Sequence, residues 1–83
     1  MNMNSKTNHS ESALKSAKRL GKVIQARRIS KGLSLADLAM GSKLLLDMIT
    51  RMERGEGLSL DNLVMISKVL KCSLADLFIE AGV

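Results

Sequence analysis

Residues 35–54 read LADLAMGSKLLLDMITRMER and contain two short helical patterns separated by a tight turn. The first pattern opens at Ser34-Leu35-Ala36-Asp37, which has the form of a capping box with Asp in place of the usual Glu. Gly41-Ser42-Lys43 interrupts it, and a second helix is expected from about Leu45 to Arg54. Because Ala39 is small where the second helix would press on the first, the two helices can cross at a steep angle.

The chain on either side of this segment is helical as well. From about Ser12, apolar residues recur at spacings of three and four, and Gly32 is a natural stop because glycine accepts the left-handed conformation. Ser59 caps a fourth helix, and Ser73-Leu74-Ala75-Asp76 caps a short fifth helix in the same way as the box at Ser34. The chain contains no proline and no strand pattern, so the sequence predicts an all-α fold.

Size and composition allow one small domain. The chain has 83 residues, of which 46% are hydrophobic, and Phe78 is its only aromatic residue, so the core must be aliphatic. Residues 1–11 have almost no apolar content beyond methionine, which predicts a disordered N-terminal arm. The folded domain is therefore expected over residues 12–83.

Several features of the sequence point to a protein of the cytoplasm. The N-terminus lacks the apolar stretch of a signal peptide, and no apolar run approaches the roughly 20 residues of a membrane span. Cys72 is the only cysteine, so no intramolecular disulfide can form, and a reducing compartment fits. We expect Cys72 to be a buried filler and the protein not to associate with a membrane.

The positive charge of the chain is concentrated in its first part. The net charge is +5 overall, with +7 over residues 1–34 and −2 over residues 35–83. A lopsided basic charge attracts polyanions, chiefly nucleic acid or an anionic membrane face. Charge alone is weak support for either partner, because solvated helix faces are also often basic.

The sequence lacks a constellation of catalytic or metal-binding residues. The only histidine, His9, lies in the polar N-terminal stretch without cysteine or acidic neighbours at ligand spacing. Most carboxylates stand near expected helix starts, where the helix dipole accounts for them. Gly55-Glu56-Gly57 follows a helix, whereas a phosphate-binding loop links a strand to a helix. We therefore expect no enzymatic activity, no cofactor and no bound metal.

A series of short motifs runs in order along the chain. They are Leu20-Gly21-Lys22, Arg27-Arg28, Lys31-Gly32-Leu33-Ser34, Asp37-Leu38-Ala39, ITRMERG at residues 49–55, Leu60-Asp61-Asn62-Leu63 and SLADLF at residues 73–78. Together they resemble the Cro and phage-repressor type of helix-turn-helix protein, often called the XRE-like family, over about residues 19–80 without a gap. The resemblance implies a five-helix, lambda-repressor-like DNA-binding domain that binds a two-fold-related operator as a dimer and regulates transcription.

The resemblance also implies which residues meet double-stranded DNA. The recognition helix, whose outer face enters the major groove, would start near Leu45, and Leu35 opens the helix before it, where the family commonly has glutamine. Positions that meet bases or phosphates on the recognition helix are Leu45, Leu46, Asp47, Thr50 and Arg51. Further candidates for phosphate contacts are Arg54, Lys43 and the residues Arg19 and Lys22.

This sequence departs from the family pattern at the DNA-reading surface. Leu35, Leu45 and Leu46 stand where polar residues are expected, and Lys43 stands where the tight turn usually has glycine. Leucine offers no hydrogen bond to a base edge and can touch only a thymine methyl group. If Lys43 keeps the left-handed conformation, it costs roughly 1 kcal/mol. These departures leave the expected fold intact and weaken the expectation of sequence-specific operator binding.

A protein-interaction module with the same fold is the alternative function. It would present Leu35, Leu45, Leu46 and Met48 to a protein partner, and an antitoxin would combine such a partner with DNA binding. A recognition helix that starts at Ser42 would bury some of these leucines instead.

The apolar C-terminal stretch is the expected surface for a homodimer. A two-fold interface there would supplement a small core. The alternative is ordinary packing of this stretch on the fourth helix. Its residues are Leu74, Leu77, Phe78 and Ile79.

Overall fold

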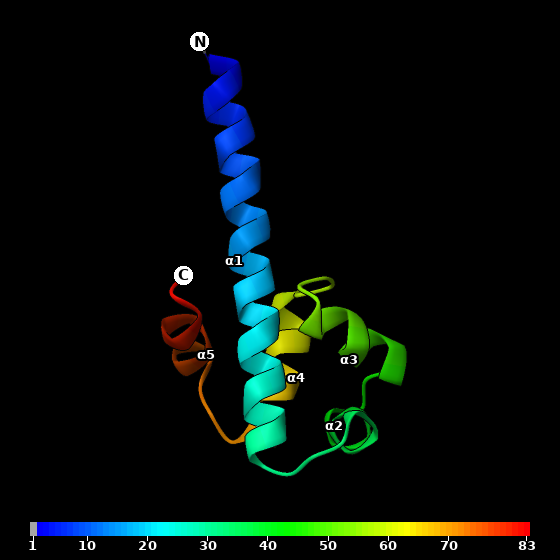
Figure 1. The fold of residues 1–83 in the computed structure, drawn as a ribbon. Coiled ribbons are helices and arrows are strands. Elements are labelled where there is room, and N and C mark those ends of the chain that lie inside the picture. Colours follow the sequence, from blue (N-terminus) through cyan, green and yellow to red (C-terminus); the bar gives the residue numbers. More distant parts are fainter. Residues whose placement is uncertain (1) are drawn as a thin grey trace.

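Five helices make up the part of the chain that the structure describes, and this part contains no strand. The computed structural model describes the backbone of residues 2–83 and the side chains of residues 11–83. The helices are α1 (Asn2–Ser30), α2 (Leu35–Ser42), α3 (Leu46–Glu53), α4 (Leu60–Leu70) and α5 (Leu74–Ala81). The all-α, five-helix fold expected from the sequence is confirmed (Figure 1).

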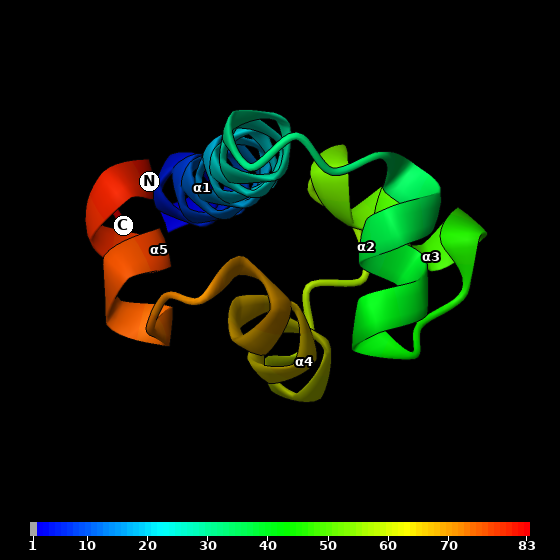
Figure 2. The ribbon, with the colours of Figure 1, turned by 90° about the horizontal axis from the view of Figure 1, so that it is seen from below.

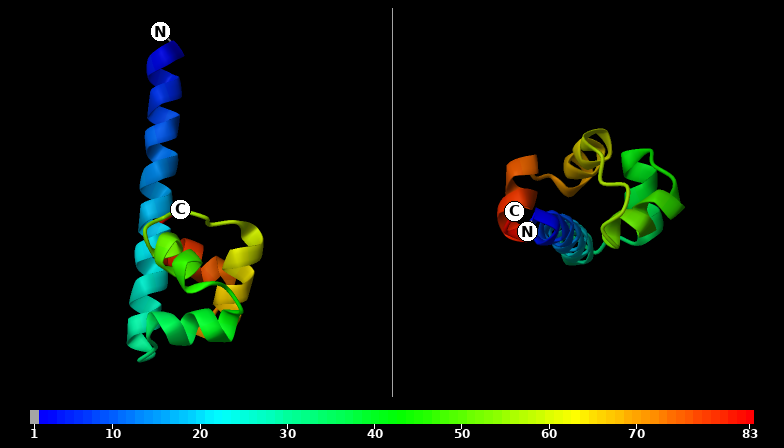
Figure 3. Two further views of the ribbon diagram at one scale, coloured as in Figure 1. Left: turned by 90° about the vertical axis from the view of Figure 1, so that its right-hand side faces the viewer. Right: turned by 90° about the horizontal axis from the view of Figure 1, so that it is seen from above.

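The long helix α1 is the element on which the other helices assemble. Helix α5 packs on one side of α1, α2 and α3 lie on the other side, and α4 closes the bundle opposite α1 (Figure 2). The N-terminal part of α1 continues beyond the other four helices, which gives the molecule extents of 47 × 23 × 19 Å (Figures 1 and 3). Helices α2 and α3 therefore form the edge of the bundle farthest from α5.

The core is aliphatic, as the composition predicted. All five helices contribute side chains to one buried cluster, and Phe78 is half-buried against it. Burial of each large aliphatic side chain stabilises the fold by about 1.5–3 kcal/mol. The buried hydrophobic residues are Leu20, Ile24, Leu38, Ala39, Ile49, Met52, Leu63, Ile66, Leu70, Leu77 and Ala81.

Serine caps begin α2, α4 and α5 at the positions that the sequence predicted. The Ser34 hydroxyl accepts a hydrogen bond from the backbone N–H of Asp37 at 2.9 Å, and the Asp37 carboxylate accepts one from the Ser34 N–H, also at 2.9 Å. Ser73 and Asp76 form the same box at the start of α5, with both distances 3.0 Å. The hydrogen bonds from the serine N–H groups lower the pKa of both aspartates. Ser59 begins α4 with a single side-chain cap.

Helix α1 begins earlier than the sequence predicted. The backbone is helical from Asn2, whereas the apolar pattern predicted a start near Ser12 after a disordered arm over residues 1–11. Met1 and the side chains of residues 2–10, His9 included, lie outside the described residues. The sequence between Asn2 and Ser12 has no glycine or proline to interrupt helical hydrogen bonding. Leu14, one of the apolar residues of this helical pattern, is exposed.

Helix α1 and the end of α3 touch through their backbones. Gly21 has no room for a side chain, because a Cβ there would lie 2.5 Å from the carbonyl oxygen of Glu53 and 2.7 Å from that of Met52. Just after α3, a Cβ on Gly55 would lie 2.9 Å from the carbonyl oxygen of Ala17. The two glycines therefore let α1 and the end of α3 approach more closely than side chains would allow.

A buried ion pair also joins α1 and α3. Arg28 Nε and Nη2 donate to the two carboxylate oxygens of Glu53 at 2.6 and 3.1 Å, and Arg28 Nη1 donates to the carbonyl oxygen of Leu33 at 2.9 Å. The two side chains are only 11% and 6% exposed. Hydrogen bonding to Glu53 raises the pKa of Arg28, so its guanidinium stays charged. The two parallel bonds add geometric specificity to the contact and fix the orientation of α3 against α1.

The turn between α2 and α3 depends on a lysine in a left-handed conformation. Lys43 has φ 62° and ψ 26°, values that glycine adopts without strain. Its backbone N–H bonds to carbonyls in the last turn of α2, which ends at Ser42 instead of near Met40 as the sequence predicted. Lys71 takes the same conformation after α4, with φ 55°.

Replacing Glu53 with glutamine is expected to lower the free energy of unfolding by about 3 kcal/mol, because Arg28 is left buried without its counter-charge. Urea denaturation followed by far-UV circular dichroism measures this change. The control is Glu56→Gln, which removes a carboxylate from an exposed pair and should change stability by less than about 1 kcal/mol. Equal effects of the two substitutions would contradict the role of the buried pair.

Lys43→Gly is expected to raise the free energy of unfolding by up to about 1 kcal/mol, because it relieves the left-handed strain. The greater freedom of glycine in the unfolded chain offsets part of this gain. The control is Lys22→Gly, the same substitution at an exposed position within α1, which should lower stability by about 1 kcal/mol. Thermal unfolding measures the stability of both variants. An equal loss of stability in Lys43→Gly and Lys22→Gly would show that Lys43 is not strained.

Candidate nucleic-acid interface

Helix α3 is buried on one side and open to solvent on the other. Ile49 and Met52 point into the core and are fully buried. At about 100° per residue, the opposite side of the helix carries the positions expected to meet DNA. All of these are exposed except Thr50, which is half-buried, and α3 itself lies at the edge of the bundle (Figure 2). They are Leu46, Asp47, Thr50, Arg51 and Arg54.

The start of α3 is apolar at its surface and lacks a side-chain cap. Leu45, at the cap position, is 77% exposed, and Leu46 after it is 50% exposed. Since the cap residue makes no side-chain hydrogen bond, the first N–H groups of α3 can donate to an anion such as phosphate. Lys43 in the preceding turn is exposed as well and adds a cation at this end of the helix.

Two polar groups on the outer side of α3 have partners within the protein. Thr50 Oγ1 donates to the carbonyl oxygen of Leu46, one turn earlier, at 3.1 Å. Arg51 Nε donates to Glu56 Oε1 at 3.4 Å, in an exposed ion pair with the loop that follows α3. Arg54 ends the helix and is exposed. Glu56 was not among the residues that the sequence singled out, because an acid on a surface for DNA matches no motif.

The remaining candidates for DNA contacts belong to α1 and α2. Arg19 Nε donates to the carbonyl oxygen of Ala81 at 3.0 Å, so its side chain faces α5, across α1 from α3 (Figure 2). Leu35 is half-buried and packs against the core cluster. Lys22 is exposed on α1. The bond to Ala81 thus holds Arg19 toward α5, and the structure does not bring it together with the surface residues of α3.

Ion pairs within the bundle neutralise part of the positive charge of α1. Arg27 pairs with Glu80 of α5, and Arg28 pairs with Glu53 of α3. Hydrogen bonding to Glu80 raises the pKa of Arg27. The positive charge of residues 1–34 is therefore partly neutralised by acids from the second part of the chain. No regular spacing links these partners, so no sequence pattern could reveal them.

The four apolar residues of α5 that were expected at a dimer interface differ in their burial. Leu77 is fully buried in the core, so the expectation that it contacts a second copy is wrong. Leu74 and Phe78 are half-buried and pack against the core, whereas Ile79 is 76% exposed. The reason is that α5 packs against α1 as well as α4, and these two helices cover most of its apolar side.

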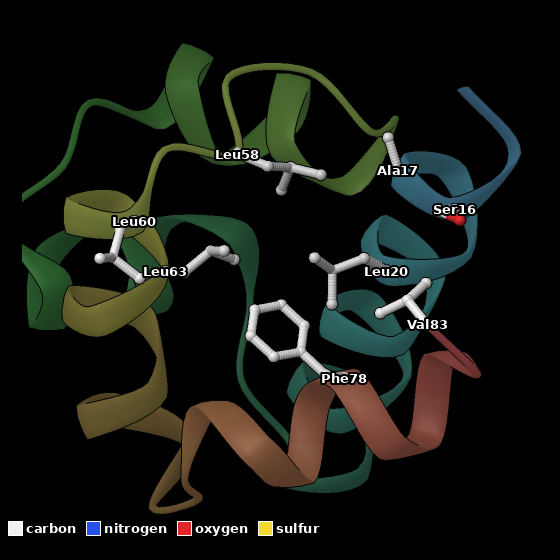
Figure 4. Close-up of a pocket in the computed structure, with 8 residues that line it drawn as sticks. All are labelled: Ser16, Ala17, Leu20, Leu58, Leu60, Leu63, Phe78 and Val83. Carbon is white, nitrogen blue, oxygen red and sulfur yellow. The ribbon is translucent and has the colours of Figure 1, made fainter. Parts of the chain in front are cut away.

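An apolar hollow beside α5 was not indicated by the sequence pattern. Its volume is about 350 Å³, and Phe78 projects from α5 into it (Figure 4). Leu60 and Val83 in its wall are exposed. The lining residues are Ser16, Ala17, Leu20, Leu58, Leu60, Leu63, Phe78 and Val83.

The described part of the chain has neither a membrane-spanning helix nor a cluster of metal ligands. None of its helices combines the length and the apolar character needed to cross a membrane. No group of three or more histidine, cysteine, aspartate or glutamate residues there is placed to hold a metal ion. Cys72 is half-buried, and burial raises the pKa of its thiol, so the thiol stays protonated at neutral pH.

Comparison with known proteins identifies the family of this fold. Residues 19–79 match the family described as the Cro/C1-type HTH DNA-binding domain. Two crystal structures of the clp gene regulator ClgR from Corynebacterium glutamicum are similar to this chain, each with a TM-score of 0.76 and 31% sequence identity, and the matches cover 81% of this chain and 87% or 72% of the ClgR chain. No curated protein gives a significant match. In agreement with the resemblance of its motifs, the chain belongs to the Cro/C1-type family of helix-turn-helix DNA-binding domains.

Proposed function

We propose that this protein is a cytoplasmic transcriptional regulator that binds duplex DNA by placing the outer side of α3 in the major groove. The observation that carries the proposal is that α3 is buried on one side and exposed on the other. Ile49 and Met52 seal its inner side in the core, while its outer side is exposed at the edge of the bundle. A single helix of this kind fits the major groove. Membership of the Cro/C1-type family and the similarity to the clp gene regulator support the same function.

The side chains of this surface divide between phosphates and bases. Lys43 and the first N–H groups of α3 are suited to phosphates at one end of the helix, and Arg54 at the other. Leu45 and Leu46 can read only thymine methyl groups, and Asp47 can accept a hydrogen bond from the amino group of cytosine. Because leucine gives no hydrogen bond to a base, DNA shape also contributes to specificity.

We infer that a second copy of the chain completes the DNA-binding unit, since two-fold dimers bind operators with two related half-sites. With Leu77 in the core, the apolar surface left for the second copy is Ile79 together with Phe78 and the hollow beside it. Leu60 and Val83 add exposed apolar area in the wall of this hollow. Burying that area would supplement the stability of a small core.

A protein-binding module is the alternative function, because Leu45 and Leu46 expose apolar surface where the family pattern has polar residues. The surface is smaller than the four side chains suggested by the sequence, since Leu35 and Met48 are half-buried against the core. Antitoxin-like use would combine such a partner with DNA. Absence of binding to duplex DNA even at low salt would favour this alternative.

Titrations with duplex DNA should show a steep salt dependence and a requirement for Arg51. Between about 50 and about 200 mM salt, affinity is expected to fall by about a thousandfold for a dimer with about six phosphate contacts. Arg51→Ala should weaken binding by about tenfold, because the side chain lies on the surface that enters the groove. Lys68→Ala, which removes an exposed cation on α4, should change it by less than about twofold. Fluorescence anisotropy measures these affinities, and equal losses in the two variants would refute this placement of the DNA surface.

Sedimentation velocity tests the homodimer. At tens of micromolar, the wild-type chain is expected to sediment as a dimer and Ile79→Glu as a monomer, because the variant places a charge in the apolar interface. Ile29→Glu makes the same change at an exposed position near the end of α1 and should leave the dimer intact. A monomeric wild-type chain at this concentration would show that the inferred interface does not form.

A further inference from the structure

The ion pair between Arg51 and Glu56 lies on the surface proposed for DNA. Arg51 Nε donates to Glu56 Oε1 at 3.4 Å, and the two side chains are 47% and 54% exposed. An exposed pair of this kind contributes little to the stability of a fold. Folding therefore does not account for an acidic side chain on a surface that would face a polyanion.

The backbone after α3 places Glu56 beside Arg51. The Glu56 N–H donates to the carbonyl oxygen of Arg51 at 2.9 Å, so main-chain and side-chain bonds join the same two residues. Gly55 and Gly57 flank Glu56 with φ 90° and 63°, which glycine adopts far more readily than other residues. Asn62 Nδ2 donates to the Gly57 carbonyl oxygen at 2.9 Å and ties the loop to α4. The carboxylate is thus held by an ordered turn.

The geometry of the pair leaves one edge of the guanidinium available. Glu56 contacts Nε and is the only side-chain polar partner of Arg51 among the residues that the structure describes. Nη1 and Nη2 can therefore donate two parallel hydrogen bonds, which match O6 and N7 of guanine in the major groove. The carboxylate also offsets the charge of Arg51. This weakens attraction to phosphates, which every sequence shares, and keeps the donors that read a base.

We propose that Glu56 is a positioning residue that directs Arg51 to a guanine in the major groove. The inference rests on the proposed function. It adds the identity of one base, since each half-site would contain a guanine that Arg51 contacts. Leu45 and Leu46 supply no hydrogen bond to a base. The reading of G·C pairs then depends on Asp47, which can accept from cytosine, and on Arg51 with its carboxylate partner, which can donate to guanine. Glu56 thereby lowers the affinity for non-specific DNA and raises the ratio of specific to non-specific affinity.

The test compares a selected duplex with a scrambled duplex of the same composition. The wild-type protein is used to select its binding site from random duplexes, and dissociation constants for both duplexes are measured at one salt concentration. For Glu56→Gln, affinity for the scrambled duplex is expected to stay equal or rise, because a negative charge is lost. Affinity for the selected duplex should fall by about tenfold. The control, Asp61→Asn, removes an exposed carboxylate in the first turn of α4 and should leave the ratio of the two constants unchanged.

Guanines of the selected site are then replaced one at a time by 7-deazaguanine, which lacks the N7 acceptor. One replacement should weaken the wild-type protein by about tenfold and leave Arg51→Ala and Glu56→Gln nearly unaffected. The proposal would be overturned if Glu56→Gln gained affinity equally for both duplexes. It would also be overturned if every 7-deazaguanine replacement changed the affinity of the wild-type protein and of Arg51→Ala by the same factor. Failure of the wild-type protein to bind any duplex would instead contradict the proposed function, and the positioning role with it.

Discussion

The orientation of α3 depends on the buried ion pair between Arg28 and Glu53. Its two parallel hydrogen bonds join the end of α1 to the end of α3, and the same guanidinium binds the Leu33 carbonyl where the chain leaves α1. Beside the pair, Gly21 lets the two backbones touch. Helix α3 has only eight residues, too few for a stable isolated helix. Its direction relative to a DNA groove therefore comes from these contacts and from the core beneath it.

Internal pairing decides where the remaining charge of the protein can act. Arg27 and Arg28 are paired with acids of α5 and α3, and Arg19 bonds to the backbone of α5, so the basic surplus of residues 1–34 overstates the charge available to a partner. Arg51 in the last turn of α3 and Arg54 directly after this helix are exposed. Under the proposed function, attraction to DNA then depends on a few cations at the surface that would enter the groove.

Local chemistry was sufficient to predict the presence of five helices and the outer side of α3. It did not give the start of α1, and contacts between distant residues were not predictable. The boxes at Ser34 and Ser73 involve residues within one turn, so the sequence contains all of the information that they need. The pair of Arg28 and Glu53 joins residues 25 apart, and no periodic pattern includes it. Leu77 shows the same limit in the core: an apolar stripe has the same spacing whether its own chain or a second copy covers it.

The leucines at the start of α3 and the acid beside Arg51 can be understood together. Leu45 and Leu46 offer contact to thymine methyl groups and no directional bond, so they discriminate weakly among base pairs. An unrestrained arginine would bind phosphates as readily as a guanine, which adds affinity without adding sequence information. Holding Arg51 through its Nε atom limits its directions and offsets its charge, and both effects favour a base over a phosphate. A recognition helix poor in polar residues therefore gains specificity from Glu56, although that carboxylate lowers its total attraction to DNA.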